Sequence, residues 1–168
     1  HSLSFVEDPT RMLRAARFEQ RLGFHIEPRT LELMTHALDL LDRVSGDRIR
    51  HELNAILQEA RPEEALCRLR QLRVLQQIYV GLTCDEWLQD KYAHVRAALE
   101  GSEWSRLKHD PNELRAFAYL ALLCYRLDLT ALEAVITRLK VPSAPAADLR
   151  PVLAIKAALP MLSRRQKR

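Results

Sequence analysis

Apolar residues along this chain recur every three or four positions, the spacing that places them on one face of an α-helix. Two clear stripes of this kind are Leu31, Met34, Leu38 and Leu41, and Ile49, Leu53, Ile56 and Leu57. No segment shows the sustained alternation of apolar and polar residues that is typical of a half-buried strand. The pattern therefore predicts an all-α protein built from many short helices.

Capping signals predict where the helices begin. An acidic residue followed by proline occurs at Asp8-Pro9, Glu27-Pro28 and Asp110-Pro111, and such pairs commonly form the N-cap and first residue of a helix. Ser45 is the expected N-cap of a further helix, and others are expected to begin near residues 62, 72, 85, 130 and 146, the last after a turn at 142–145. A break at 81–83 predicts two helical parts, residues 1–80 and 81–168.

Composition narrows the class of protein. Only four of the 168 residues are glycine, and no run reaches the roughly 18 apolar residues of a membrane span. The cysteines Cys67, Cys84 and Cys124 are odd in number and form no CxxC pair, which argues against both a disulfide framework and a zinc site. We therefore expect a cytoplasmic protein with no membrane partner.

Positive charge is concentrated in the first predicted helix. The net charge of the chain is only +4, but Arg11, Arg14, Arg17 and Arg21 are spaced so that they lie along one side of that helix. Four cations on one face repel each other unless an anion lies nearby. The anion could be a carboxylate of this protein, with Glu7, Glu19, Asp47 and Glu52 as candidates, or a phosphate of a nucleotide or RNA.

Two motifs in this region resemble a known family. The first is Glu7-Asp8-x-x-Arg11, followed by Leu13-Arg14-Ala15-x-Arg17-Phe18 and Gly23-Phe24, and the second is Ser45-x-Asp47-Arg48-Ile49-x-x-Glu52. Together they resemble the neck of class II bacterial tRNA nucleotidyltransferases and poly(A) polymerases. Asp47 stands where that family usually has Glu, and Arg73 replaces the glycine of a later Leu-Gly-x-Leu motif. The resemblance covers about residues 1–80.

The resemblance implies that this chain is the helical neck and body of a larger enzyme. In the family, an α/β head domain carries the carboxylates that hold the catalytic Mg²⁺. This chain has no Gly-Ser loop followed by paired aspartates, so we expect the head to precede it and expect the chain alone to be inactive. No catalytic residue, metal ligand or cofactor site is therefore assigned within it.

The resemblance also assigns roles to individual residues. Asp8 and Arg11 would read the base of the incoming nucleotide, and Arg14 would bind its phosphates or the RNA backbone. The motif would be supported by Glu7, Arg17, Asp47, Arg48 and Glu52. An N-cap aspartate before proline needs no further function, so Asp8 could also be purely structural.

The function that these assignments imply is nucleotide selection and RNA holding during the addition of nucleotides to RNA 3′ ends. The expected partners are the acceptor end of tRNA, ATP, CTP for a CCA-adding parent, and the head domain of the same polypeptide. The alternative is a helical module that binds protein or RNA without selecting a nucleotide.

Overall fold

The computed structural model describes the backbone of residues 4–100 and 110–165, and the side chains of these residues as far as 156. Over this range it contains α-helices, one 3₁₀-helix and no strand, which confirms the all-α prediction. The elements are α1 (Ser4–Glu7), α2 (Arg11–Leu22), α3 (Pro28–Ala37), η1 (Leu38–Arg43), α4 (Gly46–Leu57), α5 (Pro62–Gln71), α6 (Val74–Ile78), α7 (Glu86–Leu99), α8 (Pro111–Cys124), α9 (Leu129–Arg138) and α10 (Ser143–Arg165). None of the described helices is long and apolar enough to cross a bilayer.

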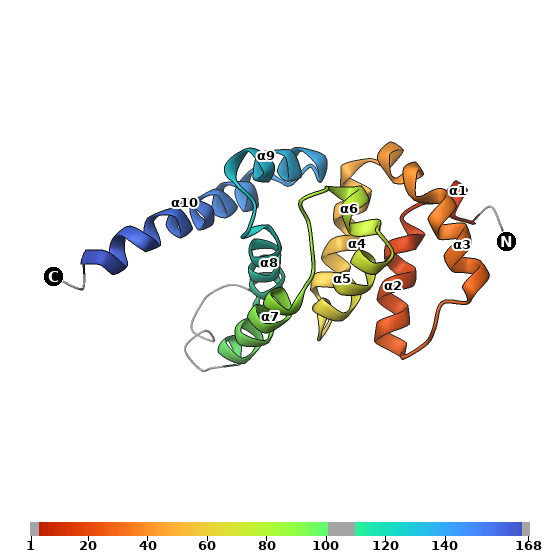
Figure 1. The fold of residues 1–168 in the computed structure, drawn as a ribbon, viewed down its shortest axis with the longest axis horizontal. Helices are drawn as coiled ribbons and strands as arrows, with labels where there is room; N and C mark the ends of the chain where they lie inside the picture. Colours follow the sequence, from red (N-terminus) through yellow and green to blue (C-terminus); the bar gives the residue numbers. More distant parts are fainter. Residues whose placement is uncertain (1–3, 101–109, 166–168) are drawn as a thin grey trace.

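The elements from α1 to α6 pack into a bundle at the amino-terminal end of the molecule (Figure 1). Helix α2 packs against α5 and α4, and its apolar face is fully buried through Met12, Leu13 and Ala16. The predicted stripe of α4 is buried as well, at Ile49, Leu53, Ile56 and Leu57. Burial of these side chains against one another supplies the main stabilisation of the bundle.

Two boundaries and one capping contact differ from the sequence prediction. The helix expected to run through Leu41 changes to the tighter η1 after Ala37, whose backbone leaves the α-region at φ −101° and ψ 2°. Ser45 occupies the N-cap position of α4, but its side chain makes no capping bond, and its carbonyl accepts the amides that follow. Helix α10 already begins at Ser143, since Pro145 falls in its first turn, where a proline sacrifices no hydrogen bond.

The remaining helices form the carboxyl-terminal part of the molecule. Helices α7 and α8 pair along their length, and the rings of Tyr92 and Tyr119 stack with their centroids 4.4 Å apart. The buried hydroxyl of Tyr92 donates to the carbonyl of Tyr119 at 2.6 Å. Helix α9 lies beside the start of α10, which then extends away from the other helices (Figure 1).

Two arginines join the two parts of the molecule reciprocally. Arg138, the last residue of α9, donates to the carbonyls of Leu41 at 2.8 Å and Val44 at 3.1 Å, where η1 ends. In return Arg50 of α4 donates to the carbonyl of Leu139 at 2.8 Å, just beyond the end of α9. Each guanidinium thus binds backbone carbonyls at a helix end in the other part of the molecule.

Gly46 allows this approach. A Cβ atom at Gly46 would lie within 3.0 Å of the backbone carbonyl of Arg138, a separation that real Cβ atoms essentially never show. The first turn of α4 can therefore approach the last turn of α9 only because residue 46 has no side chain.

The cysteines contradict the sequence prediction. Cys67 of α5 and Cys84, which precedes α7, form a disulfide, while Cys124 is free and buried. The two cysteines are 17 positions apart in sequence, but the chain turns back after α6 and brings their Cα atoms to 4.8 Å. Spacing alone could not show this, because it depends on the packing of the segment 79–85 beside α5. The bond tethers the start of the second part of the chain to the first bundle.

Candidate functional site

Asp8 lies directly before α2, and a single one of its carboxylate oxygens is held by three donors. Oδ1 accepts the amide of Thr10 at 3.1 Å and the hydroxyl of Thr10 at 2.6 Å, and it forms an ion pair with Nη2 of Arg48 at 2.8 Å. The N-cap residue is Thr10 and not Asp8 as predicted, because the turn at Pro9-Thr10 precedes the first full α-helical turn. Asp8 therefore braces the turn from outside the helix, and its carboxylate has a fixed position.

The surroundings of Asp8 keep it ionised. Burial raises the pKa of this carboxyl, but the hydrogen bonds from Thr10 and the positive charges of Arg48 and Arg11 outweigh that effect and hold the pKa below its usual value. A carboxylate in this state accepts hydrogen bonds and donates none. At neutral pH Asp8 is thus a fixed acceptor at the surface of the bundle.

Arg11 begins α2 and is exposed to solvent. Its Nη1 donates to the hydroxyl of Ser4 at 2.6 Å, which draws one edge of the guanidinium towards α1. Among the described residues Arg11 has no carboxylate partner within ion-pair distance, although its charge contributes to the lowered pKa of Asp8. Glu7, the last residue of α1, is exposed nearby.

The second motif lies against the first, since Arg48 of α4 reaches Asp8. The hollow between the two motifs measures about 230 Å³ and is lined by Asp8, Thr10, Asp47, Arg48, His51 and Glu52. Glu52 faces this hollow and lies 4.0 Å from Nε of Arg14. The structure thus brings together predicted site residues from both motifs around one depression.

Two residues of the site behave differently from the sequence expectation. Asp47 pairs with Arg50 at 3.1 Å and with Lys140 at 3.6 Å, so its carboxylate faces the carboxyl-terminal part and not the arginines of α2. His51 was not selected from the sequence, yet it lines the hollow beside Arg48. The sequence could have indicated His51, because residues three apart on a helix lie on the same face and His51 follows Arg48 by three.

The other arginines of α2 find partners that the sequence did not single out. Arg17 and Arg21 both approach Oε1 of Glu59, at 3.6 and 3.7 Å. Glu19, which was considered as a partner for these arginines, instead binds Arg68 of α5 at 2.6 and 3.2 Å. Glu59 and Arg68 both lie after the second motif, and no motif in the sequence includes either of them.

The residues described here do not provide a metal centre. No group of three or more His, Cys, Asp or Glu side chains gathers in the described part of the chain in a way that could hold an ion. The Mg²⁺ that the resemblance assigns to a head domain therefore finds no donor set among the described residues.

Fold and site together define an all-helical domain of the neck-and-body type. The sequence model of a family described as "Probable RNA and SrmB- binding site of polymerase A" matches residues 23–84, which include η1, α4, α5 and most of the first bundle. The chain belongs to the class II family of bacterial tRNA nucleotidyltransferases and poly(A) polymerases, of which it represents the neck and body region.

Individual relatives support this membership. The A-adding tRNA nucleotidyltransferase of Geobacter sulfurreducens is 48% identical over 84 residues, which are 49% of this chain and 10% of that protein. The enzyme of the same name from Aquifex aeolicus is 34% identical over 131 residues, 76% of this chain and 16% of that protein. The chain thus spans only a small part of the length of these relatives.

The similarity also holds in three dimensions. A tRNA nucleotidyltransferase solved in complex with a primer tRNA and an incoming ATP analog superimposes with a TM-score of 0.73 at 29% identity, covering 100% of this chain and 48% of that one. The likeness therefore extends well beyond residue 80, where the motifs recognised in the sequence end.

Proposed function

We propose that this chain selects the incoming nucleotide and holds the RNA 3′ end in a tRNA nucleotidyltransferase. The observation that carries the proposal is the geometry of Asp8. Its Oδ1 is held by Thr10 and Arg48 beside Arg11, a cation without a carboxylate partner among the described residues. A fixed acceptor next to an available donor is what a protein template for a base requires.

The chemistry of the pair suits cytosine and adenine. Both hydrogen bonds from Thr10 and the ion pair with Arg48 involve Oδ1, which leaves Oδ2 to accept from an exocyclic amine of a base. Arg11 uses Nη1 to bind Ser4 and keeps other N–H groups that can donate to a ring nitrogen or carbonyl oxygen. Cytosine and adenine both carry an amine beside a ring acceptor, so one Asp–Arg pair can read CTP as well as ATP.

The solved relative with bound primer tRNA and ATP analog supports RNA and ATP as partners. In this proposal Arg14, which is half exposed and lies at a loose 4.0 Å from Glu52, contacts the phosphates of the nucleotide or the RNA. Nucleotidyl transfer itself, with its Mg²⁺, belongs to a head domain that the proposal places in the same polypeptide.

The test is 3′-end addition by the enzyme that includes the head domain, with each of the four NTPs offered separately. Asp8→Ala should reduce discrimination between correct and incorrect bases by about 10- to 100-fold, because a bidentate base contact is worth about 1–3 kcal/mol. Arg11→Ala should act in the same direction. Asp128→Ala is the matched control, since Asp128 caps α9 through the amide of Ala131 at 2.8 Å and lies outside the hollow.

Unchanged base selectivity in the Asp8 and Arg11 variants would disprove the template role. The RNA part of the proposal is tested separately by filter binding of tRNA at two salt concentrations. A protein that neutralises phosphates loses affinity as salt rises, so absent or salt-insensitive binding would contradict it.

A further inference from the structure

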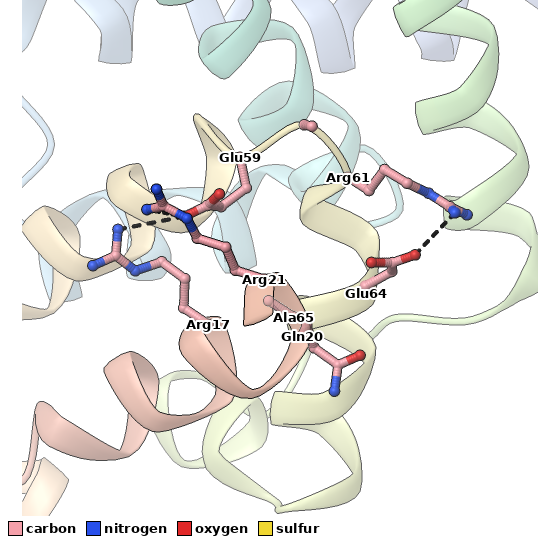
Figure 2. Close-up of a pocket in the computed structure, with 8 residues that line it drawn as sticks. Arg17, Gln20, Arg21, Glu59, Arg61, Glu64 and Ala65 are labelled. Carbon is pink, nitrogen blue, oxygen red and sulfur yellow. Dashed lines mark ion pairs between the residues drawn. The ribbon is translucent and has the colours of Figure 1, made fainter. Parts of the chain in front are cut away.

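A second group of charged residues lies at the opposite end of α2 from Asp8. Three arginines surround a pocket of about 180 Å³: Arg17 and Arg21 from α2, and Arg61 from the turn that precedes α5. Figure 2 shows Arg17 and Arg21 extending towards Glu59, with Arg61 paired to Glu64 on the other side. We call these three residues and the space between them the arginine pocket.

The carboxylates of the arginine pocket do not satisfy its cations. Glu59 serves both Arg17 and Arg21, at 3.6 and 3.7 Å, and both separations are longer than an N–H···O hydrogen bond. The Nε atom of Arg17 is buried and has no hydrogen-bond partner among the described residues. Arg61 also lies 3.7 Å from Oε1 of Glu63, but that carboxylate is already bound by Arg96 at 2.7 Å and does not line the pocket. Among the lining residues three guanidiniums therefore face two carboxylates, a surplus of one positive charge.

The three arginines differ in how freely they can reach a ligand. The side chain of Arg17 is only 17% exposed, and its guanidinium packs over the ring of Phe18. Arg21 and Arg61 are 56% and 64% exposed, so they can change rotamer at little cost. Arg17 and Glu59 are therefore held in place by the protein, whereas the exposed Arg21 and Arg61 can turn towards a ligand and donate to it.

We propose that the arginine pocket binds one backbone phosphate of RNA, with Arg21 and Arg61 as the contacting groups and Arg17 and Glu59 as positioning residues. A phosphodiester carries a single negative charge, which matches the surplus of the pocket, and its oxygens can accept from two guanidiniums at once. A volume of about 180 Å³ is below that of most small-molecule sites and suits a single phosphate group. The inference rests on the RNA-binding function proposed above.

The phosphate comes from RNA and not from the nucleotide that Asp8 and Arg11 would read. Arg21 follows Arg11 by ten residues, which corresponds to about 15 Å along the helix axis. The partners of Asp8 and of two α2 residues follow the same order along the chain: Asp8 contacts Arg48, Arg14 contacts Glu52, and Arg17 contacts Glu59. An RNA strand that has its 3′ end at Asp8 and runs along α2 would pass the arginine pocket farther from its end.

The experiment measures the affinity of this chain for a tRNA acceptor-stem minihelix as a function of salt. The double variant Arg21→Gln/Arg61→Gln should lower the slope of log K against log salt by about 0.7–0.9 and weaken binding about fivefold at roughly 0.15 M salt, as expected for one lost phosphate contact. Glu64→Gln removes the carboxylate that competes for Arg61 and should tighten binding by about two- to fivefold. A purely structural role of these residues would not produce effects of opposite sign.

Arg150→Gln is the matched control, because Arg150 is also exposed and ion-paired but lies on α10. It should leave the slope unchanged, and circular dichroism should show that all variants remain folded. If the double variant keeps the wild-type RNA affinity and salt slope, the phosphate site is refuted. The same result is expected if the pocket binds a protein partner instead of RNA. Absence of RNA binding by the wild-type chain would instead contradict the proposed function.

ATP affinity should be the same in all these variants. A loss of affinity confined to ATP would show that the pocket holds the nucleotide's phosphates and would refute the RNA assignment.

Discussion

The ion pair between Glu19 of α2 and Arg68 of α5 joins these two helices. Its removal should lower the free energy of unfolding by a large amount that depends on pH. The Glu19 side chain is only 4% exposed and receives two hydrogen bonds from Arg68, at 2.6 and 3.2 Å. It also accepts the amide of Ile26 at 2.9 Å, so it ties the loop after α2 to α5. Arg68→Met retains much of the apolar stem of the arginine but leaves the carboxylate without its cation.

Removal of one partner from a buried pair costs about 3–5 kcal/mol when the remaining charge is fully isolated. Glu19 would keep the amide of Ile26, and Arg68 is itself 22% exposed, so water can approach the carboxylate in the variant. We therefore expect a loss of about 2–3 kcal/mol in the free energy of unfolding. For a chain of this size the melting temperature should fall by about 4–12 °C.

The sign of the pH dependence follows from the pKa of Glu19. Burial raises this pKa, but the hydrogen bonds from Arg68 and from the amide of Ile26 outweigh burial and place it below the usual value of 4.5. A lowered pKa in the folded state contributes stability above the unfolded pKa and loses it as pH falls through the folded value. In Arg68→Met burial acts without the arginine, so the pKa of Glu19 should rise. The difference between wild type and variant should therefore be largest at neutral pH and shrink towards about pH 4.

Thermal unfolding followed by circular dichroism at pH 7 and near pH 4 measures both effects. Arg150→Met is the control, because the pair Arg150–Glu133 has similar geometry, at 2.5 and 3.0 Å, but is exposed on both sides. It should leave the melting temperature unchanged within error. Equal destabilisation by Arg68→Met at both pH values, or equal effects of the two substitutions, would refute the reasoning from burial.

Three further predictions concern the backbone and the disulfide. Gly46→Ala should lower the free energy of unfolding by about 1–3 kcal/mol in chemical denaturation, because its Cβ would overlap the last turn of α9, and an unchanged midpoint would contradict that packing. Arg73→Gly should raise the free energy of unfolding by about 0.5–1 kcal/mol, since Arg73 is exposed and has φ 63°, a region that glycine adopts without strain. Titration of the unfolded, non-reduced chain should detect one thiol, Cys124, and reduction of the Cys67–Cys84 bond should cost about 3 kcal/mol, whereas three titratable thiols before reduction would refute the disulfide.

Local sequence patterns predicted most of the helices, because these carry their own signals, but not α1 or η1. Asp110 before Pro111 caps α8 through the amide of Asn112, as expected from those two residues alone. The buried stripe of α4 was equally visible in the spacing of its apolar residues. Arg73 is instructive, because a residue with positive φ explains why the family motif has glycine at that position.

Contacts between distant segments were not predictable in this way. Glu59 and Arg68 pair with α2 because α4 and α5 pack beside it, and nothing in their own sequence neighbourhood indicates that partner. The Cys67–Cys84 bond was missed for the same reason. At the candidate site, the motifs predicted that Asp8 and Arg48 serve one function, but only the fold shows the 2.8 Å contact between them.

The unequal pairing of the α2 arginines decides which of them can act on a ligand. Arg17 is mostly buried against Phe18 and Glu59, so its charge is committed to the protein. Arg14 and Arg21 are about half exposed and only loosely paired, so an incoming phosphate competes with a weak internal contact. Arg11 binds a serine hydroxyl instead of a carboxylate, and its full charge remains available next to Asp8. In the proposed function, one helix presents a base-reading group at its start and phosphate-binding groups farther along. This is possible because Glu52 of α4 and Glu59, just beyond the end of α4, neutralise the later arginines only in part.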